Sequence, residues 1–144
     1  MKKTKLFFVT IFLLLLNNVK SKELSNNVIA SIDNSIITEL DLNKEINFIK
    51  YITKTQDNSK LDTLKSQSLQ NLIDRKIKNI ESDNFKIEVT EQEVEINLYN
   101  YLNNKKINTE ELNVFFKQHE IEDDYLKNIV KTDMRWSKLI QNTY

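Results

Sequence analysis

The chain contains few residues that could carry catalysis or bind a metal ion. It has no cysteine and a single histidine, His119, which is flanked by the acidic residues Glu120 and Glu122. A metal ligand, or a general base with a carboxylate partner, is one interpretation of this cluster. The other is an exposed histidine at a helix C-terminus, where a partial positive charge is favourable. Because no second histidine or cysteine is present to complete a site, we predict no metal site and no catalytic residue here.

Acidic residues and serines are the other reactive side chains. Glu91, Glu93 and Glu95 alternate along a predicted helix, so their carboxylates do not converge as a hydrolase pair does. The chain contains no glycine, which excludes glycine-rich nucleotide loops, the glycine-dependent calcium loop and the GxSxG serine elbow. We therefore predict that the protein is not an enzyme and uses no cofactor.

The aromatic residues of the C-terminal half are the strongest candidates for a binding surface. Phe115 and Phe116 are consecutive, so they point about 100° apart on a helix and cannot both fill one core layer. The apolar residues of the last predicted helix spread over roughly 220°, which is too wide for packing on one side only. We predict an exposed apolar groove for a protein or peptide. Its candidate residues are Tyr101, Phe115, Phe116, Tyr125, Met134 and Trp136.

The N-terminus has the pattern of a secretory signal peptide. Lysines within residues 1–5 precede a mostly apolar run over residues 6–16, and Val19 and Ser21 fit the positions just before a cleavage site. An uncleaved membrane anchor is the alternative, but a helix over this run would rise only about 16 Å, against a hydrocarbon core of about 30 Å. We predict that residues 1–21 are removed and that residues 22–144 form a single domain.

The charge of the cleaved chain bears on its partners and its compartment. Removing residues 1–21 takes away four lysines and no acids, which leaves 17 basic and 21 acidic residues and a net charge of −4. A nucleic-acid partner calls for a basic patch, so we predict none, and we expect no stable membrane insertion after cleavage. An exported chain without cysteine fits the bacterial periplasm.

Local patterns predict a mainly α fold with a short β-hairpin at its N-terminal end. The absence of glycine and proline favours helices. Residues 28–33 are rich in β-branched side chains, and the turn at 33–35 needs no glycine because asparagine tolerates positive φ. About five helices are expected: over 38–53, over 61–82, from the capping box at Thr90 to about Asn103, from Asn108 or Thr109 onward, and over 122–141.

The order of these segments resembles the N-terminal domain of the SurA family. Val28–Leu42 is similar to the family's strand, turn and helix start, and Leu69–Ile77 to its "LxxLIxxxL" helix. The resemblance continues in the connector and capping box Phe85–Val94 and in the last two helices, at Thr109–Leu112 and Tyr125–Ile129. It spans about residues 26–141 and implies an orthogonal bundle of helices.

The resemblance implies a periplasmic chaperone that holds unfolded outer-membrane β-barrel proteins. Family members continue into parvulin-type prolyl isomerase domains, but this sequence ends at Tyr144 and has no glycine to build one. We therefore expect the holding function without isomerase activity. One alternative is a structural or assembly subunit that uses the same surface for a fixed partner or for self-association as a homodimer. Another is the N-terminal part of a split or truncated isomerase chaperone.

Overall fold

The computed structural model describes residues 27–55 and 61–143. Within these residues a two-stranded antiparallel hairpin is followed by five helices, which confirms the mainly α fold class. The predicted signal peptide, residues 1–21, lies outside the described residues. The elements are β1 (Val28–Ile32), β2 (Ser35–Thr38), α2 (Glu39–Thr53), α3 (Leu61–Asn84), α4 (Glu91–Lys105), α5 (Thr109–Gln118) and α6 (Tyr125–Thr143).

The hairpin is built without glycine, as the sequence predicts. Its two-residue turn consists of Asp33 and Asn34 and pairs Ile32 with Ser35. Asp33, and not Asn34, has a positive φ, of 52°. Aspartate tolerates this left-handed conformation better than most non-glycine residues do. A lone hairpin is marginal in water, and here β2 contacts α2 and α3 and its residue Ile37 is completely buried.

Side-chain caps determine where three of the helices begin. At α2, the Thr38 hydroxyl accepts a hydrogen bond from the Asp41 amide at 3.2 Å, and the Asp41 carboxylate accepts one from the Thr38 amide at 2.8 Å. Thr90 and Glu93 form the same capping box at α4. Asn108 caps α5 by accepting from two backbone amides of its first turn. These bonds confirm the predicted helix starts, and each cap contributes about 1 kcal/mol.

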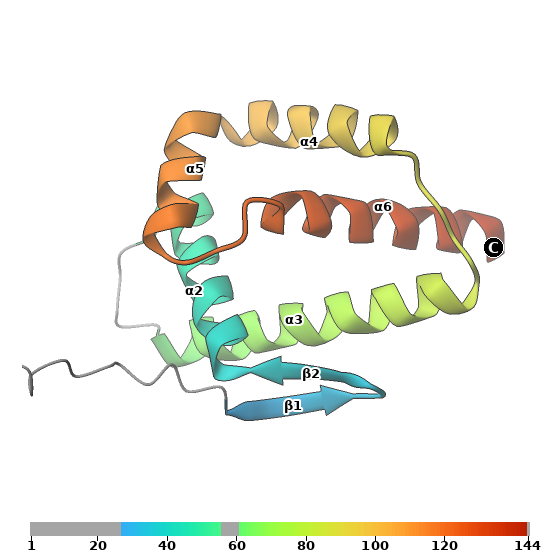
Figure 1. Cartoon of the computed structure of the whole chain (residues 1–144), viewed down its shortest axis with the longest axis horizontal. Helices are drawn as coiled ribbons and strands as arrows, with labels where there is room; N and C mark the ends of the chain where they lie inside the picture. Colours follow the sequence, from blue (N-terminus) through green and yellow to red (C-terminus); the bar gives the residue numbers. More distant parts are fainter. Residues whose placement is uncertain (1–26, 56–60, 144) are drawn as a thin grey trace, which may run out of the picture.

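Helices α3, α4 and α6 lie side by side with α6 in the middle, and α2 and α5 cross them near one end (Figure 1). α6 accordingly contacts α3 on one side and α4 on the other. It buries Leu126, Val130, Thr132 and Leu139. Packing on two sides accounts for the wide apolar arc of α6, so the arc is not in itself a sign of an exposed groove.

The main core lies where α2, α5 and α6 meet. Its buried members are Phe48, Leu112, Phe116, Ile121, Leu126 and Val130. The Phe48 ring lies 6.1 Å from the Phe116 ring and 5.4 Å from the Tyr125 ring, between centroids. Burial of each of these apolar side chains contributes about 1.5–3 kcal/mol. The cluster therefore holds the crossing helices α2 and α5 against α6.

α6 begins at Tyr125, three residues later than the predicted start at Glu122. Glu120 has a φ of 53°, which turns the chain away from α5. Ile121 then enters the core, and its amide donates to the carbonyl of Phe116 at 2.9 Å. Because Ile121 must reach inward before the chain can coil, the residues after it form a turn, and the acids there precede the helix.

Candidate functional site

The six predicted site residues do not lie on one surface. Phe116 is 1% exposed and belongs to the main core. Tyr125 is half-buried and packs its ring edge-on against Phe48 and Phe116. Trp136 is half-buried on α6. The remaining three residues line two separate surface hollows, Tyr101 and Met134 in one and Phe115 in the other.

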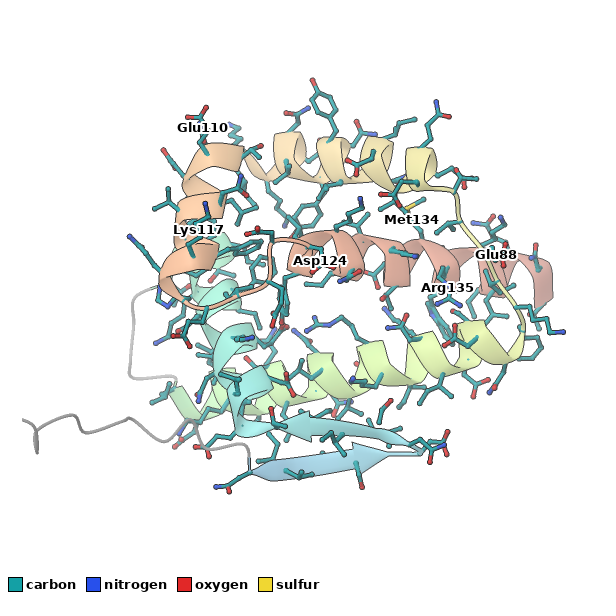
Figure 2. All side chains as sticks on the ribbon, in the orientation of Figure 1. Glu88, Glu110, Lys117, Asp124, Met134 and Arg135 are labelled. Carbon is teal, nitrogen blue, oxygen red and sulfur yellow. The ribbon has the colours of Figure 1, made fainter. Side chains whose placement is uncertain are left out.

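The first hollow, here called the α4–α6 groove, has a volume of about 670 Å³ and lies between these two helices. Figure 2 shows Met134 on α6, with its sulfur in the space between α6 and α4. Tyr101, Ile129 and Val130 are the other main apolar residues that line it. Burial raises the pKa of Tyr101, and the carboxylates of Asp133 and Glu45 raise it further, so its hydroxyl stays protonated and able to donate.

Uncharged polar side chains form the walls of the α4–α6 groove. Asn97, Asn100 and Asn104 line it from α4, at helical spacing that places them on one face. Ser137 and Gln141 line it from α6. Asn97 donates to the carbonyl of Glu93 at 2.9 Å. The side chains of the other four have no hydrogen-bond partner within residues 27–55 and 61–143.

The charged residues that line the groove are already engaged. Glu93 accepts from the Thr90 amide at 2.6 Å. Asp133 pairs with Lys78 at 2.6 Å, and Lys138 donates to the carbonyl of Glu88 at 2.8 Å. The groove therefore presents an apolar surface flanked by uncharged donors and acceptors, which suits a ligand that is neutral and polar in its backbone.

The second hollow, here called the α2–α5 cleft, has a volume of about 540 Å³. Its aromatic part consists of Tyr51 and Phe115, stacked with ring centroids 4.3 Å apart, and of His119, whose ring lies 4.4 Å from that of Phe115. Burial, with a smaller contribution from the Glu111 carboxylate, raises the pKa of Tyr51. The charged residues that line the cleft are Lys50, Lys54, Lys105, Lys106 and Glu111.

His119 is the C-cap residue of α5 and is exposed. No cluster of three or more histidine, aspartate or glutamate side chains suited to a metal ion occurs in the described part of the chain. In that same part, none of the helices combines the length and the apolar character needed to cross a membrane.

Comparison with family models identifies the architecture. A model described as the SurA-like N-terminal domain matches residues 2–140. The chain belongs to this family. No curated protein and no solved structure matches it. The SurA-like family is periplasmic and of chaperone type, its members bind polypeptides, and the N-terminal domain is its non-catalytic part.

This SurA-like domain also contains a buried polar network that joins α2, α3 and α6. The carboxylate of Glu45, which is 1% exposed, accepts from Arg75 at 3.0 Å and 2.5 Å, one bond to each oxygen. It also accepts from Asn71 at 3.3 Å and from the hydroxyl of Tyr125. Burial and the Glu45 carboxylate raise the pKa of Tyr125 well above its usual range, against the opposing effect of Arg75.

The guanidinium of Arg75 is held charged by the same contacts. Burial alone would lower the pKa of Arg75, but its hydrogen bonds and charge interaction with Glu45 outweigh that effect, so the pKa is raised. Tyr125 is thereby part of the scaffold of the SurA-like domain, because both its ring and its hydroxyl are engaged in internal contacts.

Two sets of residues in this SurA-like domain were not predicted from the sequence. The first is the row of asparagines in the α4–α6 groove, whose signal was the 3–4 residue spacing of Asn97, Asn100 and Asn104 beside Tyr101. The second is the buried network, whose signal was Glu45, an acid beside the apolar residues Ile46 and Ile49 of α2. Aromatic side chains supply apolar surface to a bound peptide, and amide side chains can hydrogen-bond to its main chain.

Proposed function

We propose that this chain is a periplasmic chaperone domain that holds unfolded outer-membrane β-barrel proteins in its α4–α6 groove, without catalysis. Membership in the SurA-like family supports a chaperone that binds polypeptides. Residues 1–21 would direct the export of the chain and would be removed by cleavage after Ser21. The mass of the protein recovered from the periplasm tests that step, because an uncleaved chain would retain the mass of the whole sequence.

The composition of the α4–α6 groove carries this proposal. An unfolded client offers a repeating main chain of amide donors and carbonyl acceptors, whatever its sequence. The unpaired amides of Asn100 and Asn104 can donate to and accept from such a chain. The thioether of Met134 is flexible and polarisable, so it adapts to client side chains of different shape. A client chain would therefore be held without demanding one sequence.

Photo-crosslinking tests where the client lies. Benzoylphenylalanine at Asn100 should form adducts with an unfolded outer-membrane β-barrel protein. The control position is Tyr99, which is 66% exposed and lies about 160° around the helix from Tyr101. Adduct yields at Asn100 that are no higher than those at Tyr99 would refute the proposed groove.

Suppression of aggregation tests whether the groove does the holding. Asn100→Arg and Ser137→Arg place bulky charges in the groove at exposed positions, so the fold should tolerate them. Both variants should protect a diluted, denatured barrel protein less well than the unsubstituted chain. Asn103→Arg, on the same helix but outside the lining of the groove, is the matched control and should protect fully.

A structural or assembly subunit is the second candidate function, and the hairpin favours it. Val28, Ile29 and Ile36 are 55%, 40% and 53% exposed, so the outer face of the hairpin is apolar. Such a face is typical of a protein contact. Light scattering separates the two functions: a tight oligomer of defined size at micromolar concentration supports assembly, and a monomer that suppresses aggregation supports the chaperone.

A further inference from the structure

We propose that the α2–α5 cleft is a second binding site, which takes polypeptide segments that carry an aromatic side chain next to aspartate or glutamate. This goes beyond the proposed function, because it uses other residues than the α4–α6 groove and adds a preference for client sequence. The two hollows differ in charge, and that difference is the basis of the inference.

The aromatic part of the cleft is fixed in position before any ligand arrives. Tyr51 and Phe115 stack with an angle of 23° between their planes, and His119 packs against Phe115. Ile52 and Ile107 add aliphatic surface to the lining. An incoming aromatic ring gains both apolar burial and ring–ring contact at such a site, and the fixed rings lose little conformational entropy when it binds.

The charge of the cleft favours a negatively charged ligand. Lys54, Lys105 and Lys106 are exposed and form no ion pair with another residue of the described ranges. In contrast, Lys44, Lys78 and Lys127 of the same chain all pair with carboxylates. The positive charge of these three lysines can therefore interact with a negatively charged ligand.

Helix ends that line the cleft offset part of this charge. α5 contributes both of its ends, at Asn108 and His119, and their opposite partial charges cancel. Lys54 and Lys106 are the C-caps of α2 and α4, and each helix C-terminus carries about −0.5 charge. Together with Glu111 these termini offset about two of the three unpaired lysine charges. An excess of about one positive charge remains even when Lys50 is set aside, so a carboxylate beside the aromatic rings is attracted to the cleft.

The corresponding surface of the α4–α6 groove has no such excess. Glu93, Asp133 and Lys138 all lie in internal hydrogen bonds or ion pairs there. A neutral segment of a client is suited to that groove and an acidic aromatic segment to the cleft. Binding at the two sites should consequently differ in its dependence on salt, because only the cleft attracts its ligand by net charge.

Fluorescence anisotropy with three labelled peptides tests the proposal on the unsubstituted chain. The first peptide carries a tryptophan between glutamates, the second has lysines in place of the glutamates, and the third has serine in place of the tryptophan. The first should bind most tightly and should weaken as the salt concentration rises. Equal affinity of the glutamate and lysine peptides would overturn the charge preference. Equal affinity of the first peptide and the serine peptide would overturn the preference for an aromatic side chain.

Two variants assign the binding to the cleft. Lys105→Glu/Lys106→Glu should weaken the glutamate peptide by about tenfold or more, since it reverses two charges. Lys65→Glu/Lys131→Glu changes the net charge equally at exposed positions that do not line the cleft, and it should leave the affinity near that of the unsubstituted chain. An equal loss in both would place the site elsewhere.

Phe115→Leu gives a second route that leaves the charges intact. It should weaken the glutamate peptide while the circular dichroism spectrum shows the fold preserved, and unchanged binding would overturn the role of the ring. Crosslinking from Asn100 tests the proposed function separately. If Asn100 forms adducts and the cleft variants leave the affinity for the glutamate peptide unchanged, only the second site is refuted.

Discussion

Replacement of Arg75 by methionine should strongly destabilise the fold. Methionine keeps most of the length and the apolar stem of arginine but removes both hydrogen bonds to Glu45. The Glu45 carboxylate, which is 1% exposed, would then keep only Asn71 at 3.3 Å and the Tyr125 hydroxyl as donors. A buried carboxylate without its counter-ion is the cause of the expected loss.

The expected magnitude follows from the burial of this pair. Breaking a buried ion pair by removing one partner costs about 3–5 kcal/mol, because the remaining charge is desolvated and uncompensated. A domain of this size has a free energy of unfolding of about 5–15 kcal/mol. The Arg75→Met variant should therefore lose at least about a fifth of its free energy of unfolding, whereas removal of an exposed ion pair costs at most about 1 kcal/mol.

Urea unfolding, followed by circular dichroism and by the emission of Trp136, measures this loss. With a slope of about 1–3 kcal/mol per molar urea, the midpoint should fall by about 1 M or more. The triple variant Glu45→Met/Arg75→Met/Tyr125→Phe replaces the whole network by apolar groups and should recover most of the stability. A loss below about 1 kcal/mol for Arg75→Met, or a triple variant less stable than the single one, would refute the reasoning.

Three further predictions concern other positions. Ser68→Ala and Ser82→Ala should each raise the free energy of unfolding by about 1 kcal/mol in urea titrations, because both hydroxyls are buried without a hydrogen-bond partner among the described residues. Thr90→Ala should lower it by about 1 kcal/mol. Hydrogen bonds from the Thr90 amide and hydroxyl lower the pKa of the Glu93 carboxyl. The part of the cap that depends on this carboxylate is therefore present above its unfolded pKa of about 4.3 and fades as the pH falls. The pKa of Tyr125 is raised in the folded state, so folding favours its protonated form. The free energy of unfolding should therefore fall as the pH rises above about 10, and Tyr125→Phe should make that fall smaller.

Each of these predictions has a matched control on the same chain. Ser66→Ala, exposed on α3, reports the helix propensity of alanine alone, and a gain equal to that of Ser68→Ala would contradict the burial argument. Thr109→Ala, at the exposed first residue of α5, should cost less than Thr90→Ala. Tyr99→Phe should leave the alkaline fall in stability unchanged, and an equal flattening would contradict the assignment to Tyr125.

The elements that the sequence predicted well are those with a local cause. The caps at Thr38 and Thr90 act over three residues, and the turn at Asp33 and Asn34 requires only residues that accept positive φ. The start of α6 was predicted three residues early because its cause is not local. Ile121 must reach the core first, and that requirement comes from Phe48 and the other core residues far away in the sequence.

The positions of the predicted aromatic residues in the fold could not be read from the sequence. Consecutive phenylalanines at 115 and 116 indicated that one ring would lie outside the core layer, yet nothing in the sequence says which. The structure buries Phe116 and leaves Phe115 stacked on Tyr51 in the α2–α5 cleft. The choice depends on where α2 crosses α5, and residues 51 and 115 are brought together only by that crossing.

By itself, then, the sequence determined the helices, the hairpin, the caps and the family, since these depend on side chains within a few residues of one another and on their order. Only the tertiary structure decided which apolar faces are covered. α6 has a wide apolar arc in any arrangement, and its packing between α3 and α4 turned most of that arc into core and left a groove lined by amides. Which surface remains for a partner is set by contacts between distant segments, and no local pattern encodes them.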